Sequence, residues 1–426
     1  MNILLLNQTF YPDVVSTAQH AADLASRLVA HGHAVTVLTS NRAYDNPDKK
    51  FPTSEVWNGV KIERVSATGL GKKAKWRRLA DFGSFLLNCC QRLTRLEKFD
   101  VVIALTTPPL VGFLGALFSR FKGGKLVYWV MDLNPDQAIA AGWIEETSAI
   151  ARLLKGMLQY SLQKAHRVIV LDRFMEGRIL AKGVSPDKVV ITPPWSHDTA
   201  IQYSEEARDR FRFEHGLDGK FVVMYSGNHS PCHPLDTIME AALQLKTRPD
   251  IKFCFVGGGS EHSRIKTFAN TNNLGNVVCL PYQPIEKLSS SLSAADLHLV
   301  VMGNKFVGIV HPCKIYNILA LGSRVLYVGP PETHVTDMCP DTAKGKWFYA
   351  AQHGDTARVV REILAAAGAP CPKSTEQVAI AARFSQDILL DRMIESIESC
   401  NSVPVSFQEQ ANLQPAGDRR TASGNL

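Results

Sequence analysis

The stretch HPCKIYNILALGSRVLYVG, residues 311–329, decides the fold because it joins a helix to a buried strand. A Pro and a Lys open the helical part, in which Ile315, Ile318 and Leu319 recur at the spacing of one helix face. A Gly precedes the run RVLYVG at 324–329, whose apolar side chains do not alternate with polar ones. Such runs are typical of parallel strands covered on both faces, so the stretch indicates an α/β sheet.

The same alternation of apolar runs and helical segments extends over both halves of the chain. In the first half the predicted strands are 2–6, 34–39, 60–65, 101–105, 125–130, 167–171 and 188–192. In the second half they are 221–227, 251–257, 277–282, 297–302 and 324–329, with helices at roughly 234–246, 261–272, 285–295 and 312–321. Because 426 residues exceed one ordinary core, the sequence predicts two doubly wound α/β domains in tandem.

Domain boundaries follow from a polar, charged segment at 193–219, which we interpret as a linker. We expect a first domain at 1–200 and a second domain at 201–384. A C-terminal helix at 385–400 is expected to return to the first domain. Residues 401–426 cannot bury a core, so they predict a disordered tail.

The composition favours a soluble protein of the cytoplasm. The hydrophobic share is 45% and the charged share 20%, as in globular proteins, and the net charge of +7 is modest, so no nucleic-acid partner is expected. The nine cysteines form no C-x-x-C pair, which indicates reduced thiols. The apolar stretch at 101–121 is interrupted by TTPP and predicts a strand, a turn and a helix rather than a membrane span.

Ligands of doubly wound sheets bind beyond the carboxyl ends of the strands, so the residues after each strand are candidates. After the strand at 221–227, Gly227 permits a close turn. The side chains that could then donate hydrogen bonds to phosphate oxygens are Asn228, His229 and His233. The alternative is an ordinary strand-to-helix loop. No G-x-G-x-x-G follows the first strand, which argues against a nicotinamide enzyme.

The helix at 312–321 is a candidate for holding an anion. Pro312 suits its first position, and His311, Lys314 and Asn317 are expected to share its exposed N-terminal face. A lysine in the first turn opposes the helix dipole by up to about 1 kcal/mol unless an anion bridges lysine and helix end. A diphosphate would do so. The alternative is a solvated surface lysine.

Asp132 is the matching candidate in the first domain. It directly follows the predicted strand at 125–130 and is expected to face the same crevice. A single acid in that place could orient or deprotonate a substrate hydroxyl. The alternative is that Asp132 only caps the helix that follows.

The segment at 71–95 has the composition of a membrane-surface helix. It holds seven Lys and Arg against one acid, with apolar side chains interleaved. This pattern favours contact with an anionic membrane surface, here the inner face of the cell membrane. The alternative is the solvated edge of a helix.

Taken together, these stretches resemble glycosyltransferase family 4, the retaining sugar transferases of the GT-B fold, over roughly residues 1–400. The matching pieces are FYPDVVSTAQHAADLASRLVAHGHAVTVLTS, TTPPLVG, MDLNPD, YSGNHSPCHPLDTIMEAA, FVGGGSE, LPYQPIEKLSSSLSAADLHLV, HPCKIYNILALGSRVL and RFSQDILLDRMIESI. The segments TTPPL, MDLNPD and PCKIYNILA look most like the bacterial branch that builds surface polysaccharides and lipid-linked glycans.

The resemblance implies two Rossmann-like domains that face each other across a cleft. It implies that the second domain binds a nucleoside-diphosphate sugar, UDP-linked, that the first binds a glycan or lipid-linked acceptor, and that no metal or further cofactor is needed. The donor contacts it implies are Ser226, Gly227, Asn228, His229, His233, Tyr282, Ile285, Pro312, Lys314 and Asn317. The catalytic residues it implies are Asp132 and Lys314, and the acceptor contacts are Phe10, Tyr11 and Thr17.

The chain departs from the family pattern at the donor site. The family usually carries two Glu separated by seven residues around this helix, and here these positions are Ile309 and Asn317. The family often places Arg and Lys where this chain has Asn228 and His233, so phosphate neutralisation is expected from Lys314, helix ends and protonated histidine. Two alternatives to a transferase remain: a GT-B sugar-nucleotide epimerase, and a non-catalytic nucleotide-sugar-binding or scaffold protein.

Overall fold

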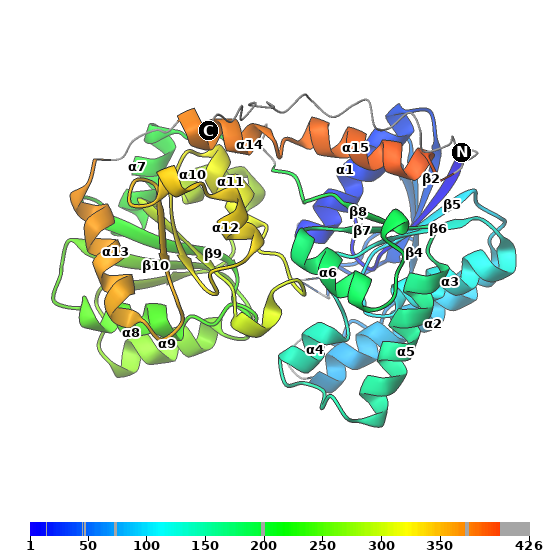
Figure 1. The fold of residues 1–426 in the computed structure, drawn as a ribbon, viewed down its shortest axis with the longest axis horizontal. Coiled ribbons are helices and arrows are strands. Elements are labelled where there is room, and N and C mark those ends of the chain that lie inside the picture. The colour runs from blue at the N-terminus through cyan, green and yellow to red at the C-terminus, as the bar shows by residue number, and fades with distance from the viewer. Residues whose placement is uncertain are drawn as a thin grey trace, which may run out of the picture.

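A computed structural model shows two α/β domains side by side, each built on its own sheet (Figure 1). It describes residues 1–13, 15–44, 46, 48–71, 75–196, 201–370 and 375–400. The tail at 401–426, predicted to be disordered, lies outside the described residues. The predicted pair of doubly wound α/β domains is confirmed.

The first domain is built on an eight-stranded sheet with the order β3-β4-β2-β1-β5-β6-β7-β8. Its strands are β1 (Asn2–Leu6), β2 (Ala34–Ser40), β3 (Ser54–Trp57), β4 (Val60–Val65), β5 (Val101–Ala104), β6 (Lys125–Trp129), β7 (Arg167–Val170) and β8 (Val189–Ile191). Neighbours pair in parallel, except that β3 runs antiparallel to β4 at the edge. All of β5 and nearly all of β1 and β6 is buried, because helices cover both faces.

The helices of this domain within the described residues cover the sheet or follow its strands. They are α1 (Ser16–Ala30), α2 (Lys75–Arg95), α3 (Val111–Lys122), α4 (Asp136–Ala140), α5 (Ala149–Lys164) and α6 (Arg173–Ala181). In α1 the residues spaced three and four apart, Leu24, Ala25 and Leu28, are fully buried. The helix ends where Gly32 takes a φ of +83° and the amide of His33 donates to the carbonyl of Leu28 at 3.1 Å.

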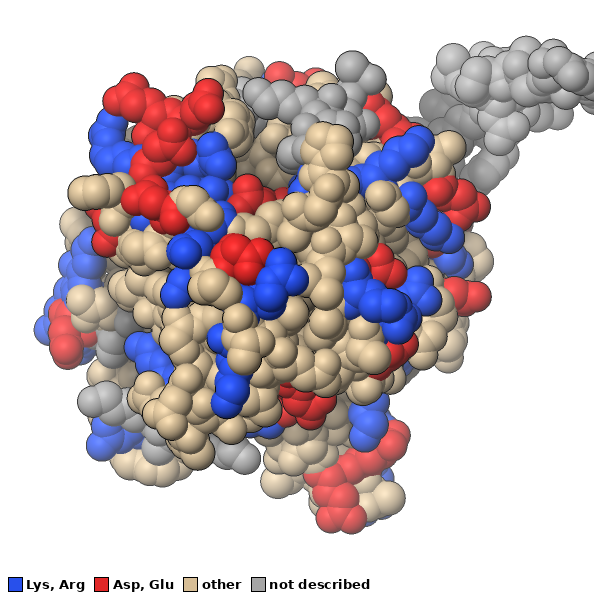
Figure 2. All heavy atoms as spheres, turned by 90° about the vertical axis from the view of Figure 1, so that its left-hand side faces the viewer, with Lys and Arg blue, Asp and Glu red and all other residues tan. Residues whose placement is uncertain are grey.

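The second domain is built on a six-stranded parallel sheet with the order β11-β10-β9-β12-β13-β14. Its strands are β9 (Phe221–Asn228), β10 (Ile251–Gly258), β11 (Val277–Leu280), β12 (Leu297–Val301), β13 (Arg324–Val328) and β14 (Phe348–Ala351). Its helices are α7 (Glu205–Glu214), α8 (Asp236–Gln244), α9 (His262–Thr271), α10 (Leu288–Ser293), α11 (Lys314–Ala320), α12 (His334–Met338) and α13 (Thr356–Gly368). Basic and acidic side chains are interspersed on its outer face (Figure 2).

The chain then crosses back to the first domain through α14 (Thr375–Ala382) and α15 (Gln386–Glu398), as Figure 1 shows. Arg27 of α1 forms ion pairs with Asp387 and Asp391 of α15. At the other end of α15, Glu398 lies 2.8 Å from Nε2 of His33. The last helix therefore joins the first domain rather than the second.

The structure corrects three details of the sequence prediction. The prediction lacks β3 and β14, which are four-residue strands at sheet edges; β3 (SEVW) is polar and half exposed, and β14 (FYAA) is apolar but short. The segment at 193–219, interpreted as a linker, contains α7, which Ser204 caps by accepting from the amide of Ala207 at 3.2 Å. Helix α11 begins at Lys314, so Pro312 precedes the helix instead of opening it.

The apolar stretch at 101–121 forms β5, a turn and most of α3, as predicted. Across the part of the chain that the structure describes, no helix combines the length and the apolar character needed to span a bilayer.

Candidate active site

Lys314 begins α11 and carries an ammonium group that is shielded from solvent. Within the described residues, no hydrogen-bond acceptor reaches its Nζ. The centroid of the Tyr225 ring lies 3.3 Å from Nζ, and a Cβ added at Gly227 would lie 3.4 Å from it. Burial lowers the pKa of Lys314 well below its usual value, because an unpaired cation is unfavourable where the dielectric constant is low. An anion bound beside Nζ would relieve this cost.

The strand ends beside Lys314 are built from glycines. The register of β9 and β10 places Gly227 beside Gly257 and Asn228 beside Gly258. Both Gly227 and Gly257 have a φ of +129°, and a Cβ on Gly257 would lie 2.1 Å from the Gly227 carbonyl oxygen. In the sequence, Gly257 and Gly258 can be recognised only as part of a run of three glycines. The register between neighbouring parallel strands is what places them in the site.

His229 and His233 lie near Lys314 but do not add positive charge. Nδ1 of His229 lies 3.3 Å from the carbonyl oxygen of Gly258, and its Nε2 is buried with no partner among the described residues. Nδ1 of His233 lies 2.8 Å from the carbonyl oxygen of Val301. Burial, and then the charge of Lys314, lower the pKa of each histidine to about 3. The prediction of a protonated histidine is therefore wrong near neutral pH. Both rings are neutral hydrogen-bonding groups.

Tyr282 covers, from the solvent side, the strand ends at Gly227, Gly257 and Gly258, which we call the glycine loop. Its side chain is half exposed, and its ring lies 3.3 Å from a Cβ placed on Gly257. The phenol Oη lies 3.5 Å from the carbonyl oxygen of Gly258, at the limit of a hydrogen bond. An aromatic ring in this place is available for a planar ligand to stack on.

The remaining predicted donor residues lie on neighbouring segments of the second domain. Ser226 is half-buried near the end of β9, and Asn228, at its last position, is exposed. Pro312 is buried just before α11, and Asn317 lies three residues after Lys314. Ile285 starts the short 3₁₀ helix Ile285–Lys287.

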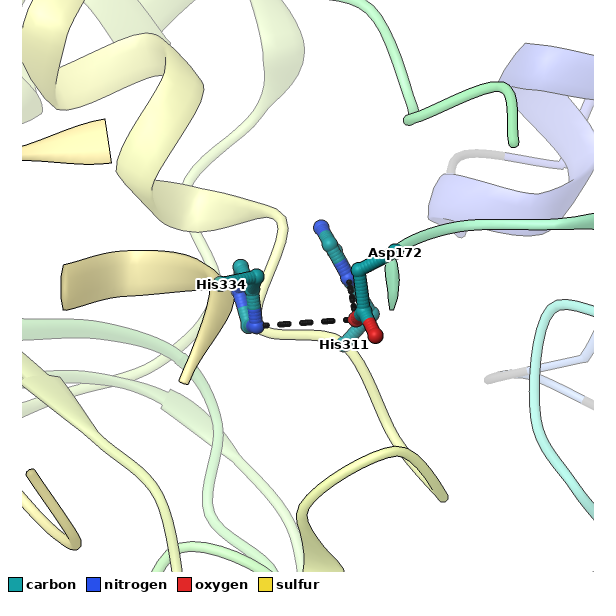
Figure 3. A group of neighbouring side chains, drawn as sticks. All are labelled: Asp172, His311 and His334. Carbon is teal, nitrogen blue, oxygen red and sulfur yellow. Dashed lines mark hydrogen bonds and ion pairs between the residues drawn. The ribbon is translucent and has the colours of Figure 1, made fainter. Parts of the chain in front are cut away.

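His311 does not share an exposed face with Lys314, contrary to expectation. It is buried, and Figure 3 shows it beside Asp172 and His334. Its Nδ1 lies 2.7 Å from Oδ2 of Asp172, and its Nε2 lies 2.6 Å from the phenol oxygen of Tyr316. Burial alone would raise the pKa of Asp172, but the hydrogen bond and charge of His311 outweigh it and lower that pKa to about 2.

The cluster of Asp172, His311 and His334 has the residue types of a metal site but not its geometry. Both ring nitrogens of His311 already have partners. The rings of His311 and His334 are stacked, with centroids 3.7 Å apart and planes 22° apart. Because lone pairs lie in the ring planes, those of stacked rings run nearly parallel and do not converge on one ion. The cluster is instead part of the contact between the domains.

Further contacts hold the two domains together around that cluster. Arg173 pairs with Asp337 through two hydrogen bonds of 2.6 and 2.9 Å. The amide of Leu133 donates to the carbonyl oxygen of Ile309 at 2.9 Å. Ile309, which occupies the first Glu position of the family pattern, is thus buried in the domain contact. Its aliphatic side chain packs in this contact and has no polar atom that could bond to a sugar hydroxyl.

Asp132 lies where the first domain meets α11. Helix α4 has Pro135 at its N-cap, so Asp132 does not cap it. Burial raises the pKa of Asp132 to about 6, although the charge of Arg78 lowers it. Burial raises the pKa of the thiols of Cys232 and Cys313, and the nearby Asp132 carboxylate raises both further. Cys313 immediately precedes Lys314, so the two predicted catalytic residues lie on facing segments of the two domains.

The predicted acceptor residues occupy the loop after β1 and the start of α1. Phe10 is only 2% exposed and packs edge-on against Trp57, so its ring supports the loop from inside. Tyr11 is exposed and stacks on Trp57 with centroids 4.3 Å apart. Oγ1 of Thr17 lies 3.3 Å from Oγ1 of Thr9. Of the three, Phe10 is the one whose side chain an acceptor cannot reach.

Family comparisons match both domains. The glycosyl transferase 4-like domain model matches residues 17–195, and the glycosyl transferases group 1 model matches residues 207–311. The chain is a GT4-type glycosyltransferase. Among relatives, it is 26% identical over 359 residues to WcaI of Escherichia coli K12, a glycosyl transferase named for colanic acid biosynthesis, covering 80% of this chain and 86% of WcaI. It is 24% identical over 269 residues to WbjE of Pseudomonas aeruginosa, named as a glycosyltransferase, covering 63% and 67% of the two chains.

Solved structures agree on the fold of this glycosyltransferase. Sucrose-phosphate synthase of Thermosynechococcus elongatus superposes with a TM-score of 0.74 at 16% identity, covering 94% of this chain and 98% of that one. HepE of Anabaena, solved with UDP-glucose, superposes with a TM-score of 0.69 at 15% identity, covering 94% and 100%. The predicted GT-B architecture is thereby confirmed.

Proposed function

We propose that this glycosyltransferase transfers a sugar from a UDP-linked donor to a hydroxyl of a glycan or lipid-linked acceptor, with retention at the transferred carbon, in surface polysaccharide synthesis. Residues 201–384 bind the donor and residues 1–200 the acceptor. The observation that carries the proposal is the shielded ammonium of Lys314 beside the glycine loop, which no hydrogen-bond acceptor of the described residues reaches. WcaI supports the pathway through its name, and HepE supports the donor because it was solved with UDP-glucose.

The donor's diphosphate occupies the space beside Nζ of Lys314. Glycine at 227 leaves that space open, since a side chain there would contact the ammonium. Bond cleavage adds negative charge to the departing diphosphate, and a fixed cation in a water-poor place stabilises that charge more than it stabilises the intact donor. The neutral rings of His229 and His233 each direct Nδ1–H toward a backbone carbonyl oxygen, so their Nε2 atoms can accept but not donate, and the charge of the diphosphate is met by Lys314.

Asp132 positions the acceptor. With a pKa of about 6, its carboxyl group is mostly ionised at neutral pH and accepts a hydrogen bond from the acceptor hydroxyl. Within the described residues its carboxylate has no hydrogen-bond partner, while its amide donates to Oγ1 of Thr106 at 3.3 Å. The oxygens are therefore free for a substrate.

Helix α2 is the surface through which the enzyme reaches a membrane from the cytoplasm. Phe85, at its centre, is fully buried, while Trp76, Leu79 and Leu87 are 61%, 69% and 72% exposed. These three lie on one helix face by their spacing, and the preceding sequence is rich in lysine. The structure of Lys72 and Lys73 lies outside the described residues.

Two experiments test these proposals. Incubation with a panel of nucleotide sugars, scored by mass spectrometry, should give a glycosylated acceptor and a free nucleoside diphosphate. An isomerised sugar nucleotide would point to an epimerase. Tight binding of the nucleotide sugar with no sugar transferred would point to a scaffold protein.

Flotation with anionic liposomes should recover the protein, and the double variant Leu79→Ser, Leu87→Ser should not be recovered. Equal flotation with neutral and anionic lipid would contradict a charge-dependent membrane surface.

A further inference from the structure

Helix α2 carries a stripe of apolar and small residues that the rest of the described chain leaves uncovered. We call it the α2 stripe, and its residues, all exposed, are Trp76, Leu79, Gly83, Leu87 and Cys90. Steps of three and four residues keep them on one side of the helix. On the opposite side, Phe85 and Cys89 are fully buried in the first domain. The helix therefore has one face for its own core and a second apolar face without an intramolecular partner.

The α2 stripe has the same spacing in both directions from Gly83. Leu79 and Leu87 lie four residues before and after it. Trp76 and Cys90 lie seven residues before and after it. A twofold axis through Gly83 would set two copies of α2 antiparallel, with Leu79 of each copy on Leu87 of the other. A face with this symmetry is complementary to a second copy of itself.

Contacts within the chain do not explain the glycine at the centre of the stripe. Gly83 lies in the interior of a helix, where glycine is less favourable than alanine. A Cβ added at this position would meet nothing within 4 Å outside its own turn of helix. The distance at which two helices pack depends on the side chains at their crossing point, so glycine lets a second helix come close.

The charges beside the stripe are compatible with the antiparallel arrangement. Between residues 76 and 90, the charged residues of α2 are Arg77, Arg78 and Asp81. The axis at Gly83 sets each of them opposite an uncharged residue of the second copy, so like charges are not brought together. A parallel pair would instead place each arginine beside the same arginine of the other copy.

We propose that in solution the α2 stripe is covered by a second copy of this chain, in an antiparallel pair of α2 helices about a twofold axis at Gly83. Five residues on each partner are fewer than the about 20 to 30 of a standard interface, so the dimer is weak, with a dissociation constant in the micromolar range. The proposed membrane contact uses Trp76, Leu79 and Leu87, so the dimer must open before the protein binds a membrane. Dimerisation itself needs neither donor nor acceptor.

Sedimentation velocity of the full chain, from about 1 to 100 µM, measures the dimer. The wild type should pass from monomer to dimer over this range. Gly83→Ala places a methyl group from each copy at the crossing point, so its dissociation constant should rise at least tenfold while its melting temperature does not fall. Gly156→Ala, at an exposed glycine of α5 with equally open space, is the matched control and should dimerise like the wild type. A monomer at every concentration, or unchanged dimerisation of Gly83→Ala, overturns the proposal.

Interchain disulfides test the register of the pair. In a Cys90→Ser background, oxidised Gly83→Cys should give a dimer linked through residue 83, as located by mass spectrometry, because the axis brings the two copies of that residue together. Gly156→Cys in the same background should remain unlinked. In the wild type, rapid linkage of Cys90 to Cys90 would indicate a parallel pair and would overturn the proposal.

Liposome flotation separates the dimer from the proposed membrane contact. The Gly83→Cys protein should float with anionic liposomes when it is reduced but not when it is linked, because the linked dimer keeps its stripe covered. Equal flotation of the two forms overturns the shared stripe. A wild type that floats but never dimerises overturns the dimer alone. A wild type that dimerises but does not float overturns the membrane contact of the proposed function.

Discussion

Replacing Lys314 by Met should slow sugar transfer without weakening the fold. Met is close to Lys in length and carries no charge, so it can fill the space beside Tyr225. In the free protein Nζ has no hydrogen-bond acceptor among the described residues, so the change forfeits no hydrogen bond. In the transition state the same ammonium faces the charge of the leaving diphosphate. One such donor contributes about 2 to 4 kcal/mol, which corresponds to about 30- to 900-fold in kcat/KM.

The assay measures release of nucleoside diphosphate at several donor concentrations, together with urea unfolding of the free protein. Lys246→Met, at an exposed position of the same domain, is the matched control and should leave both quantities unchanged. Burial lowers the pKa of Lys314, so the unfolded chain binds this proton more tightly than the folded one. Wild-type stability relative to Lys314→Met should therefore rise as the pH increases toward the ordinary lysine pKa. An unchanged kcat/KM, or a large loss of stability in the variant, would refute the reasoning.

Three further predictions concern other residues. Asp132→Asn should lower kcat at least about 100-fold with unchanged UDP affinity, and the wild-type rate should fall as the pH drops through about 6, a limb that the variant should lack. Gly257→Ala should weaken UDP binding measured by calorimetry, because its Cβ would lie 2.1 Å from the Gly227 carbonyl oxygen; equal affinity would remove the glycine loop from the site. Asp172→Asn keeps the α6 cap but loses the charged contact with His311. Because the folded pKa of Asp172 is about 2 and its ordinary value is 3.8, this contact stabilises the fold above pH 3.8 and is lost as the pH falls through 2. Urea unfolding should show a cost of about 2 kcal/mol at pH 7 that vanishes in acid.

The fold could be predicted because its central strands are almost entirely buried. Runs such as VVIA at 101–104 have no polar alternation, and this pattern distinguishes central parallel strands from edge strands. The edge strand SEVW at 54–57 is half exposed and polar, so the same rule does not detect it. Helical spacing also located the buried face of α11, and the position of strand ends indicated Asp132 and Gly227.

The parts of the site that the sequence does not give depend on long-range contacts. His311 lies before the first helical residue, so helical periodicity does not apply to it, and its partner Asp172 is 139 residues away in the chain. Arg78 looks like one of several surface cations of a basic helix until the structure shows its Nε buried in a cavity with Gln8. Protonation is equally hidden, because the neutrality of His229 follows from burial that no local pattern records.

Proton uptake on UDP binding tests most directly whether Lys314 meets the diphosphate. Calorimetry of the same titration in buffers of different ionisation enthalpy, between about pH 7 and pH 9.5, measures the protons exchanged. The bound diphosphate should restore the charged form of Lys314, so the wild type should take up more protons than Lys314→Met. Identical proton exchange by the two proteins over the whole range would contradict the assignment of this ammonium to the donor.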